Sequence, residues 1–174
     1  MIGYTNVGYQ SDPHNGRSQT SSVFLQNGTA ISWTSSKQTL ATTSTNHSKI
    51  VALYEASREC VWLCRMINHI QQSCGLKAII APTIIYEDKM AYVTQMETGY
   101  IKSNINKHIS PMLFFPPELQ QNGDIDILKS KSCDNLADLF TKSLPTSLFK
   151  NVSKKLVCDI LGICMVQGEK SPRH

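Results

Sequence analysis

The sequence predicts an α/β domain built on one mixed sheet with helices on both faces. Three observations predict it: a paired-strand signal near the start, a long run with helical periodicity, and two short strands that alternate with shorter helices. A meander followed by strand–helix units gives three antiparallel strands and then two parallel ones, because a helical crossover returns the chain in the same direction. The predicted sheet therefore has five strands.

Length and composition exclude several classes of protein. The 174 residues carry a formal net charge of +4, and 17% of them are charged, which is below the roughly 25% of an average globular protein. This composition argues against a disordered chain, and the charge is too small to indicate a nucleic-acid binder by itself. We see no signal peptide and no apolar run near the ~20 residues that cross a bilayer. We therefore expect a soluble, intracellular monomer without a membrane partner, in either the cytoplasm or the nucleus.

The first three strands are predicted from turn chemistry. Residues 3–9 are compatible with a strand, and residues 10–20 form a polar stretch that we interpret as a loop. Apolar segments at 23–25 and 30–33 then flank Asn27-Gly28, the dipeptide best suited to a type I′ turn. Together these segments predict an antiparallel meander.

Residues 46–74 carry the longest periodic pattern in the chain. Apolar residues recur there at steps of three and four, which is typical of one buried helical face: Leu53, Ala56, Cys60, Leu63, Ile67, Ile70 and Cys74. Ser44 or Thr45 can cap the start. Lys49 falls on the same face in the first turn, where a cation opposes both burial and the helix dipole. A simpler interpretation is that its stem lies along the edge of the sheet and its ammonium reaches water.

The remaining elements are short. We expect a strand at 82–86, a helix at 90–95, a helix at 108–121, a strand at 124–129, a short helix at 134–142, and a last helix capped by Thr146 or Ser147 that buries Leu148, Val152, Leu156 and Ile160. Pro116 and Pro117 should break or bend the helix at 108–121, since an interior proline costs roughly 3 kcal/mol. Residues 1–145 are assigned to the main domain, and 146–174 to a C-terminal helix and loose tail.

The six cysteines allow two interpretations. Cys60, Cys64 and His69 lie close together on the predicted long helix, so a zinc site is conceivable. However, the sequence contains no CxxC pair and no second ligand pair at the usual spacing. We therefore favour reduced, buried thiols that pack in the core.

Carboxylates at the ends of the predicted elements indicate a possible metal site. Asp88 directly follows the strand at 82–86, and Asp138 lies one helical turn after Asp134. Carboxylates held on separate elements suit a Mg²⁺ site for phosphoryl transfer, because hard cations prefer oxygen ligands. Alternatively, Asp88 and Asp134 only cap helices.

Several ordered blocks of sequence point to a family. The matching blocks are Gly3-Tyr4, Ser11-Asp12-Pro13-His14, Ala30-Ile31-Ser32-Trp33, Lys37-Gln38-Thr39-Leu40, Ala52-Leu53-Tyr54-Glu55-Ala56-Ser57-Arg58-Glu59, Ile85-Tyr86-Glu87-Asp88, Gly99-Tyr100-Ile101-Lys102, Lys107-His108-Ile109 and Asp134-Asn135-Leu136-Ala137-Asp138-Leu139-Phe140-Thr141-Lys142. Over residues 3–161 the chain resembles the ribonuclease H domain of plant copia-type retrotransposon polyproteins. The resemblance implies a ribonuclease H-like fold and an ancestral nuclease that cuts the RNA strand of an RNA·DNA hybrid with two Mg²⁺ ions held by four carboxylates.

This chain departs from the family at two of those four positions. In this chain Asn6 stands where the family has an aspartate on the first strand, and Lys49 stands where it has a glutamate on the long helix. The third and fourth acids are retained as Asp88 and Asp138. Lys89 replaces the asparagine that usually follows the third acid. The four positions thus sum to −1 instead of −4. A lysine about 5 Å from a dication is repelled by on the order of 7 kcal/mol at an effective dielectric of 20, before screening.

The resemblance and these departures lead to three hypotheses. The first is a degenerate ribonuclease H domain that binds Mg²⁺ weakly or not at all and does not catalyse. The second is a non-catalytic module that binds an RNA·DNA hybrid through phosphate contacts, or a reverse transcriptase in trans. Its candidate nucleic-acid contacts are Lys37, Lys102, Lys107 and Lys131. For these lysines we favour the simpler interpretation of a solvated surface, because the net charge is only +4. The third is residual activity with one metal on Asp88 and Asp138, helped by Glu87 or Asp134.

Overall fold

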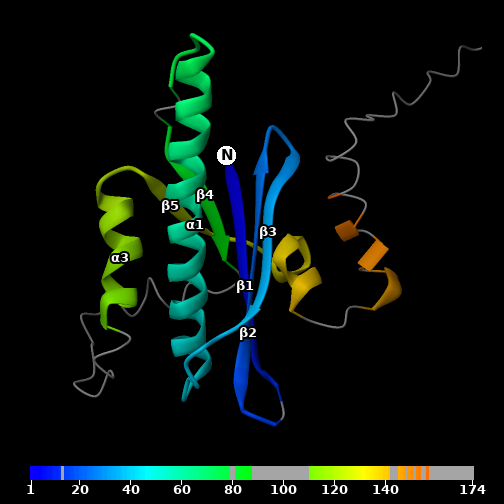
Figure 1. The fold of residues 1–174 in the computed structure, drawn as a ribbon. Helices are drawn as coiled ribbons and strands as arrows, with labels where there is room; N and C mark the ends of the chain where they lie inside the picture. The colour runs from blue at the N-terminus through cyan, green and yellow to red at the C-terminus, as the bar shows by residue number, and fades with distance from the viewer. Residues whose placement is uncertain are drawn as a thin grey trace, which may run out of the picture.

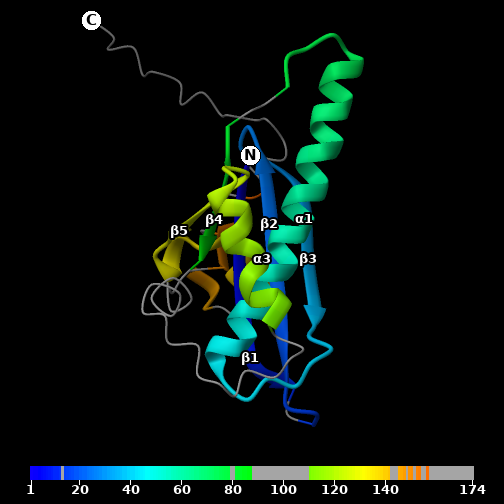
Figure 2. The ribbon, with the colours of Figure 1, turned by 90° about the vertical axis from the view of Figure 1, so that its left-hand side faces the viewer.

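The computed structural model describes residues 1–12, 14–78, 81–87, 110–141, 145–147, 149–150, 152–153 and 156. Five strands and two α-helices dominate the described chain (Figures 1 and 2), in the order β1 (Ile2–Asp12), β2 (Arg17–Gln26), β3 (Thr29–Lys37), α1 (Thr45–Ser73), β4 (Thr83–Glu87), α3 (Ser110–Gln121) and β5 (Ile125–Lys129). Two 3₁₀ turns follow, η1 (Ser132–Asp134) and η2 (Leu136–Phe140).

The strands form one mixed sheet in the spatial order β3-β2-β1-β4-β5. The β1–β2 and β2–β3 pairs are antiparallel, and the β1–β4 and β4–β5 pairs are parallel. Asn27 and Gly28 both have positive φ, of 52° and 81°, as a type I′ turn requires. The predicted fold class is confirmed: a three-strand antiparallel meander joined to two parallel strands, with helices packed on the sheet.

Alternation along the strands sends side chains to two faces, because successive residues of a strand point in opposite directions. Phe24 packs in a cluster with residues of α1 and α3 on one face, whereas the adjacent Val23 packs with Leu136 on the other. Figure 1 shows α1 and α3 on one side of the strands and the 3₁₀ turns on the opposite side. Val152 and Leu156, from beyond residue 145, are buried in the second cluster, and the domain division at 145 stays a prediction.

The long helix α1 begins and packs largely as predicted. The Ser44 side chain accepts a hydrogen bond from the His47 amide and caps the helix. Its apolar face is buried from Ile50 to Leu63, but Ile70 is 53% exposed and Cys74 is also exposed. The prediction of burial was wrong at this end, because the helix extends past the end of the sheet (Figure 1).

The predicted loop at residues 10–20 was wrong. Strand β1 continues to Asp12 and β2 starts at Arg17, so both strands extend into this polar stretch. Asp12 pairs with Arg17, and the register is irregular between Gly8 and Asp12. Cross-strand contacts explain why: the Lys37 ammonium lies 3.0 Å from the Asp12 carboxylate. Tertiary pairing therefore overrides the weak strand propensity of these residues.

Of the predicted break or bend at Pro116 and Pro117, the break was wrong, because α3 runs through both prolines. Leu113 and Leu119 are buried in the main cluster on either side of them, and the Phe115 ring meets the Tyr54 ring of α1 edge-on at 5.5 Å. We attribute the continuity to this packing, which offsets the lost backbone hydrogen bonds.

Three further predictions concern the later elements. The short helix at 134–142 was wrong in type, since its described part forms the two 3₁₀ turns. Thr146 and Ser147 already lie within the last helix, where the Phe149 amide donates to the carbonyl of Pro145. The helix at 90–95, together with Leu148 and Ile160, lies outside the described residues. Among the helices that are described, none has the length and apolarity needed to cross a membrane.

Candidate functional site: two polar contacts at the centre of the sheet

Asn6 and Asp138, predicted to share a site, meet in the structure. Asn6 lies in the central strand β1 and is 4% exposed, and Asp138 lies in η2 and is 5% exposed. The Asn6 amide donates hydrogen bonds to the Asp138 carboxylate and, at 2.9 Å, to the Thr141 hydroxyl. The Asn6 amide thus directs an N–H group at the carboxylate oxygen of Asp138, the residue that the family resemblance implies is a metal ligand.

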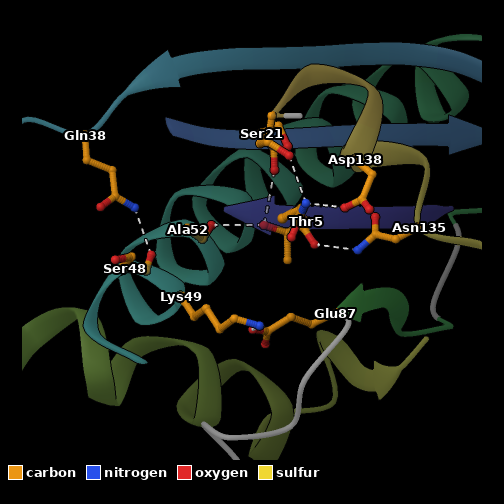
Figure 3. A network of polar contacts seen from close by, with 11 residues as sticks. Thr5, Ser21, Gln38, Ser48, Lys49, Ala52, Glu87, Asn135 and Asp138 are labelled. Atoms are coloured by element: carbon orange, nitrogen blue, oxygen red, sulfur yellow. Dashed lines mark hydrogen bonds and ion pairs between the residues drawn. The ribbon is translucent and has the colours of Figure 1, made fainter. Parts of the chain in front are cut away.

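A buried asparagine holds the turn that carries Asp138. The Asn135 side chain donates to the Thr5 carbonyl at 2.9 Å and accepts from the Ala137 amide at 3.0 Å, and Asn135 is fully buried. The Ser21 hydroxyl adds a bond to the Ala137 carbonyl at 2.8 Å. These contacts join η2 to β1 and β2 (Figure 3), so the position of Asp138 is set by the sheet.

Thr5 connects this turn with α1. Its hydroxyl lies 3.3 Å from the Ser21 carbonyl and 3.4 Å from the Ala52 carbonyl of α1. The Thr5 side chain therefore points to the face of β1 that α1 covers, opposite to the face that η2 covers. Asn6, the next residue, points to η2, as strand alternation requires.

Lys49 contacts a carboxylate of the parallel part of the sheet. Its ammonium nitrogen lies 3.9 Å from Oε1 of Glu87, the last residue of β4, and the two side chains are 12% and 5% exposed. Figure 3 shows them extending toward each other between α1 and β4. The ammonium therefore does not simply reach into water, and it places a positive charge beside the end of β4.

Of the other predicted site residues, Lys37 and Lys131 are described, and both lie away from this centre. Asp88, Lys102 and Lys107 lie outside the described residues. Lys37 is 62% exposed and pairs with Asp12. Lys131 lines a cavity of about 250 Å³ with Ile2, Tyr4, Tyr86, Ser130 and Asp134, in which the two tyrosine rings stack at a centroid distance of 5.3 Å.

Three of the four positions of the predicted metal site are described, namely Asn6, Lys49 and Asp138. Mg²⁺ needs oxygen ligands, mostly anionic ones. Of the predicted positions that are described, Asn6 turns N–H groups toward Asp138, Lys49 brings an ammonium, and Asp138 alone offers a carboxylate. In the described part of the chain, no group of three or more His, Cys, Asp or Glu side chains is placed to hold a metal ion.

That result also bears on the zinc alternative. Cys60, Cys64 and His69 are described and do not form such a group. Cys60 is buried, but Cys64 is half-buried and Cys74 and Cys133 are exposed. The prediction of buried thiols was therefore wrong for three of these four cysteines.

Two functional contacts were missed from the sequence. The sequence presents Glu87 only as a further acid beside Asp88. Period-two alternation from the buried Ile85 places Glu87 on the face that α1 covers, where Lys49 contacts it. Asn135 belongs to the motif at residues 134–142, which does not reveal its role. An asparagine just before a short turn is a typical cap, and this signal could have found it.

Comparisons with known proteins identify relatives of this chain. No family model matches the chain. The sequence is 28% identical over 157 residues, or 90% of its length, to the retrovirus-related Pol polyprotein from transposon TNT 1-94 of Nicotiana tabacum. It is 26% identical over 126 residues, or 72% of its length, to that from transposon RE1 of Arabidopsis thaliana. The chain spans only 11% and 8% of these two polyproteins.

A solved structure agrees on the fold. The N-terminal ribonuclease H domain of a Mycobacterium tuberculosis protein, solved as a fusion with maltose-binding protein, aligns with a TM-score of 0.52 at 12% identity, covering 88% of this chain and 96% of that one. The resemblance drawn from the sequence motifs is confirmed. The chain is thus a relative of one segment of plant retrotransposon Pol polyproteins, and it has the ribonuclease H-like fold.

Proposed function

We propose that this chain is a retrotransposon ribonuclease H domain that no longer catalyses. Its ancestral reaction is hydrolysis of the RNA strand of an RNA·DNA hybrid, in which two Mg²⁺ ions held by four carboxylates supply the attacking and leaving-group chemistry. This assignment of activity combines the similarity to Pol polyproteins with the ribonuclease H-like fold.

The observation that carries the loss of activity is the almost buried ammonium of Lys49 beside Glu87. A dication at this place would meet a positive charge in a region of low dielectric, where repulsion is strong. The ammonium instead supplies a cation that belongs to the protein, and it lies beside the Glu87 carboxylate.

The Asn6 contact supports the same proposal independently. An amide can offer an oxygen to a metal, but here its nitrogen faces the Asp138 carboxylate, which serves as the acceptor of a protein hydrogen bond. Metal binding at Asp138 would have to break that bond and turn the amide, without gaining a charge to neutralise the ion.

The test is cleavage of a labelled RNA·DNA hybrid in Mg²⁺ by the native chain and by the Asn6→Asp, Lys49→Glu double variant. We expect an inert native chain and an active double variant, because the variant restores both carboxylates on an unchanged scaffold. An Asp138→Asn change added to the double variant is the matched control and should abolish the recovered cleavage. Cleavage by the native chain that Asp138→Asn removes would refute the proposal.

A second function, a non-catalytic nucleic-acid-binding module, is favoured by one observation. Lys131 lies beside the stacked Tyr4 and Tyr86 rings in an open cavity, and a cation next to aromatic rings suits a phosphate and an adjacent base. Titration of a labelled hybrid at two salt concentrations tests this. Binding that weakens with salt and is reduced by Lys131→Ala would support the module, and salt-independent or absent binding would exclude it.

A further inference from the structure

A groove lies between α1 and the last two strands of the antiparallel meander, apart from the site described above. It measures about 640 Å³, which falls in the range of roughly 300–1,000 Å³ for small-molecule sites. Alternation along β2 sends Ser21 to η2, where its hydroxyl bonds the Ala137 carbonyl, and therefore sends Thr20 and Ser22 to the face that α1 covers. The groove and η2 thus lie on opposite faces of the sheet.

The sheet side of the groove is a cluster of hydroxyl groups. Thr20 lies opposite Ser36, and Ser22 lies opposite Thr34, in the β2–β3 pair. All four side chains line the groove. Ser22 is 5% exposed, and its hydroxyl has no hydrogen-bond partner in the described part of the chain. Since a hydroxyl both donates and accepts, this buried group at the groove wall is available to a ligand.

The α1 side of the groove carries charged groups and one aromatic ring. Glu55 and Glu59 are one helical turn apart and line it. Arg58 and Trp62 lie beside them. The Ser32 hydroxyl of β3 donates to the Glu59 carboxylate at 2.9 Å, so α1 and β3 lie side by side here (Figure 2). Trp62 is 56% exposed, which leaves its ring open to a ligand in the groove.

The charges on this wall are not balanced. The two carboxylates and one guanidinium sum to −1, in a chain whose formal net charge is +4. Neither carboxylate forms an ion pair with a described lysine, arginine or histidine, and the Arg58 guanidinium lies over the Tyr54 ring, 5.7 Å from its centroid. Burial raises the pKa of Glu55, because the charged form loses hydration. The groove therefore attracts a cation and disfavours a phosphate.

We propose that this groove binds a linear alkyl cation, in which ammonium or guanidinium groups are carried on a methylene chain. A free polyamine and the basic side chains of a peptide share this chemistry. The N–H groups of the ligand donate to the Glu55 and Glu59 carboxylates in charge-assisted hydrogen bonds, and to the Ser22 hydroxyl. The Trp62 ring attracts the cation through its π face.

A neutral polyhydroxy ligand fits the groove less well. It would also meet the hydroxyl groups of β2 and β3, but it would leave the two carboxylates without a counter-charge. The inference does not depend on the loss of nuclease activity, because its residues differ from those of the metal site.

Trp62 fluorescence tests the proposal on the full chain. The chain has two tryptophans, and strand alternation places Trp33 on the sheet face opposite α1, so Trp33→Phe leaves Trp62 as the single reporter. This variant is titrated at low salt, where charges are least screened, with spermidine, with the blocked peptide acetyl-Lys-Gly-Lys-amide, and with ribose. We expect a saturable change in emission with at least one of the two cations, and none with ribose.

Charge variants in the Trp33→Phe background locate the binding. Glu55→Gln and Glu59→Gln should each weaken it about tenfold or more, because a charge-assisted hydrogen bond is lost. The matched control is Glu118→Gln, which removes the same charge at an exposed position of α3 and should change binding less than about twofold. Ser22→Ala removes a neutral partner and should weaken binding about twofold to tenfold.

The two cations separate the possible sources of the ligand. Tighter binding of spermidine indicates a free polyamine, and tighter binding of the peptide indicates basic side chains; both results retain the proposal. No saturable response to either cation would overturn it, as would equal weakening by Glu55→Gln and Glu118→Gln in variants that circular dichroism shows to be folded. Saturable binding of ribose alone would also overturn it and would assign the groove to a neutral ligand.

Discussion

Asn135 offers the sharpest test of how the fold positions the Asp138 turn. Replacing it with alanine removes the bond to the Thr5 carbonyl and the bond from the Ala137 amide, at a position with no exposed surface. Each intramolecular hydrogen bond contributes about 1 kcal/mol net, and a buried group left without its partner costs about 1–3 kcal/mol. We therefore expect Asn135→Ala to lower the free energy of unfolding by about 2–4 kcal/mol.

Urea unfolding of the native chain, Asn135→Ala and Asn122→Ala measures this effect. Asn122 is exposed in the turn after α3, so its alanine variant controls for the chemistry of the substitution and should stay within about 0.5 kcal/mol of the native chain. The midpoint of Asn135→Ala should fall while the slope is unchanged, as expected for a loss of stability alone. A loss no larger than that of Asn122→Ala would refute the role assigned to Asn135.

Three other predictions follow from contacts near the site. In Gly8→Ala the new Cβ would lie 2.9 Å from the Thr141 backbone oxygen, so we expect a loss of about 1–3 kcal/mol in urea unfolding, and a neutral result would contradict that close approach. Lys49→Met removes the cation beside the buried Glu87 and should cost about 3 kcal/mol; an unchanged or raised thermal midpoint would show that the pair does not stabilise the fold. Hydrogen bonds from Asn15 and then Lys37 lower the pKa of Asp12 from 3.8 to about 2, so its stabilisation is complete above pH 3.8 and disappears as the pH falls through about 2. The difference in stability between the native chain and Asp12→Asn should therefore shrink between pH 5 and pH 2, and a constant difference would contradict this assignment.

Much of the fold could be predicted because its strongest signals are local. The Asn27-Gly28 turn fixes the β2–β3 hairpin, and the helical periodicity around Leu53 and Leu63 fixes α1. Where the prediction failed, tertiary contacts decide the structure. Asp12 belongs to a strand because the paired strands and Lys37 hold it there, and no local pattern records that contact.

The site was predictable in its composition and less so in its contacts. Helical periodicity alone predicts that Lys49 lies on a buried helix face, where a cation is unfavourable. The motif match predicts that Asn6 and Asp138 share a site. The partner of Lys49 depends on how α1 lies across β4, which is a property of packing. The role of Asn135 depends on the Thr5 carbonyl, a backbone group that no side-chain pattern reveals.

If Asn6 and Lys49 remove the metal site, calorimetric titration of Mn²⁺ reveals the loss without a hybrid substrate or turnover. The native chain and the Asn6→Asp, Lys49→Glu double variant are titrated side by side, with Mn²⁺ standing in for Mg²⁺ as a hard divalent cation. We predict no saturable heat for the native chain up to ~10 mM metal and saturable binding by the double variant. Saturable binding to the native chain that Asp138→Asn abolishes would show that the metal site is retained.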